Sequence, residues 1–192
     1  MAKKQLGAHD IFFPCPAALI VSGHGKTANI ITLAWVGMTS CSPPTLEIAV
    51  RKTRHSYELI RTTGAFTVNI PNAQQAAETD FCGMVSGNNV DKFAATGFTP
   101  QPSLHVASPI IAECPLNLEC TVINEIEVGS HQVFIGEILE VHIDEKAMTD
   151  GKIDMSKANP LVYAATVGEY WRLGQKVADS FSAGLAIKHE KK

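Results

Sequence analysis

The 192-residue sequence is poor in charge and has no long apolar run. Only 18% of its residues are charged, and a formal net charge of −3 provides no basic surface for nucleic acid or an anionic membrane. No apolar stretch approaches the roughly 20 residues of a membrane span, and the first residues lack the apolar segment and cleavage site of a secretion signal. These absences predict a cytoplasmic protein without nucleic-acid or membrane partners.

Cysteines are few and do not occur in pairs. None of the five belongs to a Cys-x-x-Cys motif of the kind that metal sites and dithiol redox sites use. Free cysteines are usually buried, so we expect mostly buried, reduced thiols, a reducing compartment and no metal site. The five are Cys15, Cys41, Cys82, Cys114 and Cys120.

Two nucleotide-binding fingerprints are also missing. Ser22 to Thr27 ends in Gly-Lys-Thr, as a Walker loop does, but the first glycine of that motif would fall at Ile20, and no helical pattern follows. A hairpin turn explains this stretch better. No Gly-x-Gly-x-x-Gly joins a strand to a helix, so a Rossmann site has no support.

The sequence also lacks the pattern of a hydrolase or an acyl transferase. Such enzymes need a nucleophile together with a base and a third group that orients the base, and no such set is recognisable.

The sequence does contain many short apolar runs separated by turn residues. Such runs predict strands, and two further stretches predict short helices that end at glycines. The predicted strands are 17–21, 29–36, 46–50 and 65–70, and the predicted helices are 56–61, ending at Gly64, and 73–81, ending at Gly83. The polar stretches 86–115 and 147–160 predict loops, with at most one helical turn near 90–93.

The clearest pattern is a long hairpin. Apolar residues alternate over 116–122 and again over 133–143, around a Gly129-Ser130 turn, with a slip near Gly136 that predicts a bulge. Closing such a sheet on itself removes its exposed edges. We therefore predict a mainly β fold, an antiparallel barrel with helical insertions, in one domain over residues 1–192. The lysine-rich end, 188–192, is predicted to be a solvated tail.

One segment has the composition of an anion site. Arg51 to Ser56 places three cations and two hydroxyls directly after a strand and before a helix. Main-chain N–H groups at a helix start, with charged and hydroxyl donors, hold phosphate groups. A solvated turn with a Ser or Thr helix cap is the alternative. Ser86 to Lys92 is a second polar loop, whose lysine is by itself typical of solvated surface.

Three other features allow two interpretations each. Asn29 to Trp35 carries polar groups and a tryptophan in an otherwise buried strand, which is typical of a wall for a flat ligand or of a core tryptophan with paired hydroxyls. His131 begins the second strand of the hairpin and alone is typical of a surface histidine. Cys41 could relay electrons, although packing is the usual role of a free cysteine.

In order and spacing these segments resemble the flavin reductase-like, FMN-binding split-barrel family, and within it the flavoredoxin branch. The resemblance covers about residues 14 to 174, nearly the whole chain. Its motifs are Asn29 to Trp35 with Cys41-Ser42-Pro43-Pro44, Arg51 to Ile60, Gly64 to Pro71, Ser86-Gly87 through Asp91-Lys92-Phe93, Glu113 to Cys120, and Gly129 to Glu137.

The resemblance implies a six-stranded split barrel, a homodimer, and FMN held near the dimer interface. For the isoalloxazine ring it implies contacts with Asn29, Thr32, Ala34, Trp35, Ser40, Cys41, His131 and Tyr163. For the phosphate and ribityl chain it implies contacts with Arg51, Thr53, Arg54, His55 and Ser56, closed by Ser86, Gly87 and Lys92. A cation or N–H donor near the N1 and O2 edge raises the flavin potential, a role for His131 or Lys92. An unchanged midpoint in a redox titration of substituted protein would contradict that role.

Three functions remain open on these grounds. The first is an NAD(P)H-dependent flavin reductase, in which hydride passes to N5 of bound FMN. The second is a flavoredoxin-like electron carrier that a protein partner reduces, and the third is a barrel that binds another ligand or none. The missing nucleotide fingerprint does not separate the first two, because the family stacks nicotinamide on the open flavin face without one. The third leaves the phosphate-type segment and the aromatic wall unexplained.

Overall fold

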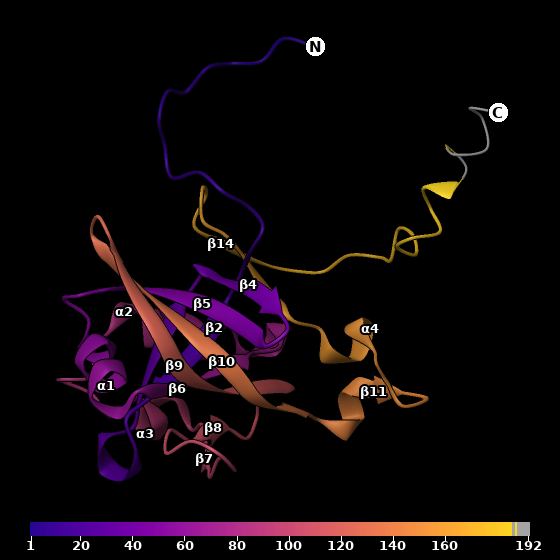
Figure 1. Ribbon diagram of the computed structural model, residues 1–192. Helices are drawn as coiled ribbons and strands as arrows, with labels where there is room; N and C mark the ends of the chain where they lie inside the picture. Colours follow the sequence, from indigo (N-terminus) through magenta and orange to yellow (C-terminus); the bar gives the residue numbers. More distant parts are fainter. Residues whose placement is uncertain (186, 188–192) are drawn as a thin grey trace.

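The structure is a computed structural model that describes residues 1–185 and 187 (Figure 1). Its body is a seven-stranded antiparallel sheet with the strand order β3-β2-β6-β9-β10-β5-β4. These strands are β2 (Ala18–Ser22), β3 (Asn29–Leu33), β4 (Val36–Cys41), β5 (Pro44–Arg51), β6 (Ala65–Ile70), β9 (Leu116–Val128) and β10 (His131–Ile143). The predicted mainly β fold is confirmed. The expected number of six strands is wrong, because the single strand predicted over 29–36 is two, β3 and β4.

The sheet closes into a barrel because its two edge strands follow each other in the chain. β3 and β4 stand at opposite ends of the strand order, yet only Ala34 and Trp35 lie between them. The sheet must therefore curl until its edges approach each other. At this junction Trp35 O accepts a hydrogen bond from Ala49 N of β5, at 3.1 Å. β3 keeps a hydrogen-bonded strand, β2, on one side only.

The barrel interior explains the predicted bulge. Phe66 of β6 and Phe134 of β10 are almost completely buried there. The pairing of β9 with β10 shifts at Gly136, where an added Cβ would lie 2.7 Å from Cζ of Phe66. Glycine at this position therefore makes room for the phenylalanine ring. A second apolar cluster on the outer side of β2 and β3 includes Leu19 and Ile111, so β2 is buried on both faces.

Three helices lie against the barrel: α1 (His55–Thr63), α2 (Ala76–Met84) and α3 (Lys92–Thr96). α1 ends as predicted at Gly64, whose φ of 63° is left-handed. The prediction that a helix ends at Gly83 is wrong, because α2 runs through that residue. A Cβ on Gly83 would lie 3.3 Å from Cβ of Thr32. The glycine therefore lets the helix approach β3 closely.

Short elements complete the described chain. They are β1 (Cys15–Pro16), η1 (Gly25–Thr27), η2 (Ala73–Gln75), β7 (Pro100–Gln101), β8 (Ile110–Ile111), η3 (Glu145–Ala147), β11 (Met148–Thr149), β12 (Lys152–Ile153), α4 (Met155–Ala158), β13 (Leu161–Ala164) and β14 (Glu169–Arg172). The stretch 147–160 is thus not the plain loop that its polar composition predicts. The predicted tail, 188–192, lies outside the described residues. Among the helices that the structure describes, none is long and apolar enough to cross a membrane.

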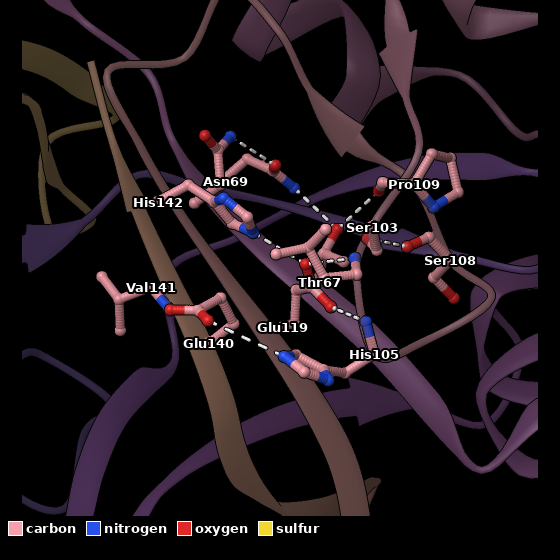
Figure 2. A network of polar contacts seen from close by, with 12 residues as sticks. Thr67, Asn69, Ser103, His105, Ser108, Pro109, Glu119, Glu140, Val141 and His142 are labelled. Atoms are coloured by element: carbon pink, nitrogen blue, oxygen red, sulfur yellow. Dashed lines mark hydrogen bonds and ion pairs between the residues drawn. The ribbon is translucent and has the colours of Figure 1, made fainter. Parts of the chain in front are cut away.

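A polar network fastens the loop between β7 and β8 to the outside of the barrel (Figure 2). Glu119 of β9 is completely buried, and its carboxylate accepts hydrogen bonds from Leu104 N at 2.7 Å and His105 N at 2.6 Å. His142 Nε2 lies 2.7 Å from the same carboxylate. Thr67 Oγ1 donates to Pro109 O at 2.8 Å. Polar pairing, not apolar packing, therefore holds this loop.

Candidate functional site

Three segments that are far apart in the sequence meet at Asn29. This buried side chain begins β3, and its Nδ2 donates to Oγ of Ser56 in the first turn of α1, at 2.8 Å. A Cβ on Gly87 would lie 1.9 Å from Oδ1 of Asn29 and 3.0 Å from Cδ2 of His55. The loop after α2 can reach β3 only because residue 87 has no side chain. The structure thus brings together four predicted site residues, in what we call the Asn29 junction: Asn29, His55, Ser56 and Gly87.

The chemistry of this junction favours an anion. Ser56 Oγ accepts a hydrogen bond from Asn29, which leaves its own proton for another acceptor. The first N–H groups of α1 lie beside it, at the positive end of a nine-residue helix. The alternative of a Ser or Thr cap is wrong, because Arg54 is the N-cap residue and no side-chain cap hydrogen bond forms.

The cations around the junction differ in whether they pair with a carboxylate. Lys52 Nζ is paired with Glu127 Oε2 at 2.6 Å, whereas Arg51 and Arg54 form no ion pair with any carboxylate in the described residues. Thr53, Arg54 and Ser86 are exposed beside the junction. Two guanidinium groups therefore remain available to an anionic ligand.

Lys92 is buried, contrary to the solvated lysine that a polar loop suggests. Its side chain is 4% exposed, and Nζ donates to Ile30 O at 2.6 Å and to Cys82 O at 2.7 Å. Burial, and secondarily the nearby Arg54, lowers its pKa, although Cys82 acts in the opposite direction. These two hydrogen bonds from the ammonium connect α3 to β3 and α2. The contact of Lys92 with a phosphate stays a prediction.

A cavity of about 280 Å³ lies at the other end of β3. Thr32, Ala34 and Tyr163 line it, as the resemblance implies for ring contacts. The Tyr163 ring centroid is 5.2 Å from that of Tyr170, whose Oη donates to Asp80 Oδ1 at 3.2 Å. Burial, and then the Asp80 carboxylate, raises the pKa of Tyr170, which therefore keeps its proton. This end of β3 has an aromatic wall.

The open edge of β3 connects the two ends. Ile30 O points away from β2, because Lys92 Nζ reaches it from outside the sheet. Alternate residues of a strand direct their main-chain groups to the same side, so the N–H and C=O of Thr32 also face outward. From Asn29 to Ala34 the strand rises roughly 16 Å. A ligand with an anionic group at Asn29 and a flat ring at Ala34 would run along this edge.

Trp35 and His131 form a pair on the outside of the barrel. Their ring centroids are 4.5 Å apart, and Trp35 is 43% exposed. His131 lies opposite Arg51 in the pairing of β10 with β5. Burial, and then the Arg51 charge, lowers the pKa of His131, so the imidazole is neutral at pH 7. The interpretation of a core tryptophan is wrong, whereas His131 lies on the surface of the barrel, partly covered by Trp35.

Ser40 and Cys41 do not join the other predicted residues within one chain. They pair with Thr45 and Pro44 at the far end of the β4–β5 hairpin. Arg51 is six residues beyond Thr45 on the same strand, which corresponds to roughly 20 Å. Cys41 is exposed, so the expectation that it packs is wrong. The other four thiols are free and buried, as predicted for most of the cysteines.

Sequence reasoning missed the outer part of the ring cavity. Asp80 and Met84 come from α2, and Tyr170 comes from β14. These residues meet only through tertiary contacts, so no local sequence pattern predicted that they would line one cavity. The one available signal in the sequence was the spacing of Tyr163 and Tyr170, which pair with each other across the turn of one small hairpin.

Comparison with known proteins identifies the family. Residues 10–171 match the flavin reductase like domain. The chain belongs to the flavin reductase-like family. An uncharacterised protein of Archaeoglobus fulgidus is 38% identical over 157 residues, which cover 81% of this chain and 87% of that protein.

Two solved structures of flavoredoxins are similar to this member of the family. Flavoredoxin of Desulfovibrio vulgaris (Miyazaki F) superposes with a TM-score of 0.90 at 38% identity, covering 95% of this chain and 100% of that one. Flavoredoxin from Methanosarcina acetivorans superposes with a TM-score of 0.90 at 32% identity, covering 97% and 100%. The resemblance and the split-barrel fold are confirmed, and the family indicates a redox function that involves flavin.

Proposed function

We propose that this flavin reductase-like protein binds FMN along the open edge of β3 and passes electrons through it. The observation that carries the proposal is the Asn29 junction. There Gly87, Ser56 and the start of α1 meet at one end of a strand whose other end lines an aromatic cavity, and their chemistry favours an anion. FMN has one phosphate and one flat ring, joined by a ribityl chain, and this order matches the order of the two ends.

In this proposal the two ends of the β3 edge bind different parts of FMN. At the phosphate end, Ser56 and Arg54 donate to the anion, and Gly87 keeps the loop close. At the ring end, Thr32 and Tyr163 provide a wall, while outward main-chain groups of β3 can pair with the polar edge of the ring. When bound, FMN supplies hydride and single-electron chemistry. The protein contributes position, charge and exclusion of water.

NAD(P)H-dependent flavin reduction is the first activity that we propose. The ring cavity is partly open and has aromatic walls, so a second flat ring could reach the flavin face. An electron carrier reduced by a redox protein is the second candidate, and the similarity to two flavoredoxins favours it. A barrel without flavin is disfavoured, because it would leave the Asn29 junction without a ligand.

An absorption spectrum separates these activities. Purified protein is mixed with FMN, freed of excess, and treated anaerobically with NADH and then with NADPH. We expect retained flavin peaks that bleach with a pyridine nucleotide. Peaks that are retained but do not bleach would favour the carrier and redirect the search to a protein donor. A colourless protein would contradict the cofactor assignment.

We also propose a homodimer, supported by the outer face of the barrel near Trp35. Cross-strand pairing places Ala49, Val133 and Ile126 in one row, and Val128 follows beside His131. Ile126 and Val128 are 46% and 57% exposed, and exposed apolar rows of this kind mark interfaces. A partner on this face would cover the Trp35–His131 pair.

Sedimentation velocity tests the dimer. We expect the mass of two chains for the unmodified protein and of one chain for the double variant Ile126→Lys, Val128→Lys, because two buried ammonium groups would not be paired. Ile153→Lys is the matched control, since Ile153 is 52% exposed elsewhere on the surface. A monomeric unmodified protein at micromolar concentration would refute the proposal.

A further inference from the structure

The ring cavity at the far end of β3 has a negatively charged lining. Among the described residues, Asp80 is the one acid that lines it, and no Lys, Arg or His does so. Asp80 forms no ion pair in the part of the chain that the structure describes. His131 and Lys92, the candidates for a cation at the flavin edge, are not part of this lining. A ring in the cavity therefore meets a carboxylate that no cation compensates.

Hydrogen bonds hold this carboxylate at the cavity. Tyr170 Oη of β14 donates to Asp80 Oδ1 at 3.2 Å. On the other side, the Thr32 hydroxyl of β3 donates to the main-chain carbonyl of Thr79, the residue before Asp80. The part of α2 that carries Asp80 is thus fastened both to the strand and to the hairpin that line the cavity.

A carboxylate beside a flavin affects its two redox states differently. The oxidised ring is neutral, whereas reduction places negative charge at the N1 and O2 edge. The cavity measures only about 280 Å³, so a ring in it lies close to Asp80. Like charges at such short range repel appreciably near a protein surface, although solvent screens part of the repulsion because Asp80 is exposed. The repulsion weakens binding of the reduced ring and leaves binding of the oxidised ring nearly unchanged.

We propose that Asp80 makes this protein bind oxidised FMN more tightly than reduced FMN, which makes the bound flavin a stronger reductant than it would be without this charge. The inference rests on the proposed function, because it requires FMN with its ring in this cavity. The two effects are one quantity, since the ratio of the two dissociation constants sets the shift in midpoint potential on binding. A lower potential favours delivery of electrons to an acceptor over storage of reduced flavin.

Anaerobic titrations of the full-length protein with oxidised FMN and with dithionite-reduced FMN, at a slightly alkaline pH where the reduced ring is anionic, test the proposal. In Asp80→Asn, reduced FMN should bind about five- to tenfold more tightly, while affinity for oxidised FMN changes less than about twofold. The midpoint potential should rise by about 20–30 mV, the equivalent for a two-electron couple. Asparagine keeps an oxygen that can accept from Tyr170, so the substitution removes the charge and retains the hydrogen bond.

Asp150→Asn is the matched control, because Asp150 is an exposed aspartate outside the cavity lining. It should leave the ratio of the two affinities unchanged. If Asp80→Asn changes the two affinities equally or changes neither, Asp80 does not act on the redox state, and the proposal is overturned while FMN binding stands. If the unmodified protein binds neither form of FMN, the proposed function fails and this inference fails with it.

Discussion

Replacing Gly87 by alanine is expected to weaken FMN binding by about 100-fold. A Cβ at this position would overlap Oδ1 of Asn29, so Asn29 must leave Ser56 or the loop must withdraw from β3. Either movement removes at least two donors from the phosphate end. Hydrogen bonds to charged groups contribute roughly 1.5–3 kcal/mol each, and two of them at the lower end of this range correspond to about two orders of magnitude in affinity.

Fluorescence titration with FMN measures this effect. Gly174→Ala is the control, because Gly174 has no atom within 4 Å of a built Cβ and lacks a positive φ. Thermal unfolding of both variants shows whether the fold survives. If Gly87→Ala binds FMN as tightly as the unmodified protein, the ligand does not use the Asn29 junction.

Replacing Glu119 by leucine is expected to lower the free energy of unfolding by about 3–5 kcal/mol, because the hydrogen-bond donors around a completely buried carboxylate would lose their acceptor. Two main-chain N–H groups and the His142 imidazole would lose their shared acceptor (Figure 2). Urea denaturation measures the loss. Glu140→Gln is the control, since its exposed carboxylate lies 3.7 Å from His105 and should contribute less than about 1 kcal/mol.

The same carboxylate makes stability depend on pH. Burial alone would raise the pKa of Glu119, but hydrogen bonds from Leu104 N, His142 and His105 N outweigh burial and lower it. A carboxyl group with a lowered folded pKa stabilises the protein above its unfolded pKa and ceases to do so as pH falls through the folded value. Melting temperatures should therefore fall below about pH 4.5, and less steeply in Glu119→Gln. Parallel profiles for both proteins would show that Glu119 is not responsible.

The fold was largely predictable because its strands have local signals. The alternation over 116–143 gave the hairpin and its bulge, and Gly64 gave the end of α1. The break between β3 and β4 was not visible, because Asn29 to Val36 is continuously strand-like and the turn at Ala34 arises from closure of the sheet. Gly83 looked like a helix end because a helical glycine usually is one, whereas here it serves packing against Thr32.

The site was predictable in composition and not in arrangement. Arg51 to Ser56 has the residue types of an anion site, and the structure places beside it Gly87, which the resemblance assigns to the phosphate, and Asn29, which the resemblance assigns to the ring. The burial of Lys92 was not predictable, because a lysine next to a loop is normally solvated, whereas this one donates to two carbonyls. The ring cavity depends on α2 and β14, which are brought together only by the fold.

Lys92 also affects which groups can pair with the edge of β3 that has no neighbouring strand. A sheet edge attracts strands from other molecules, and proteins often prevent this by placing a lysine there. By occupying Ile30 O, the ammonium blocks strand addition along the first half of β3, so that the outward main-chain groups of Thr32 are the ones left without a strand partner. The unpaired edge is thus too short for another strand to join, and long enough for a small molecule. One buried ammonium therefore both prevents edge-to-edge strand pairing and limits the surface to which the proposed ligand can bind.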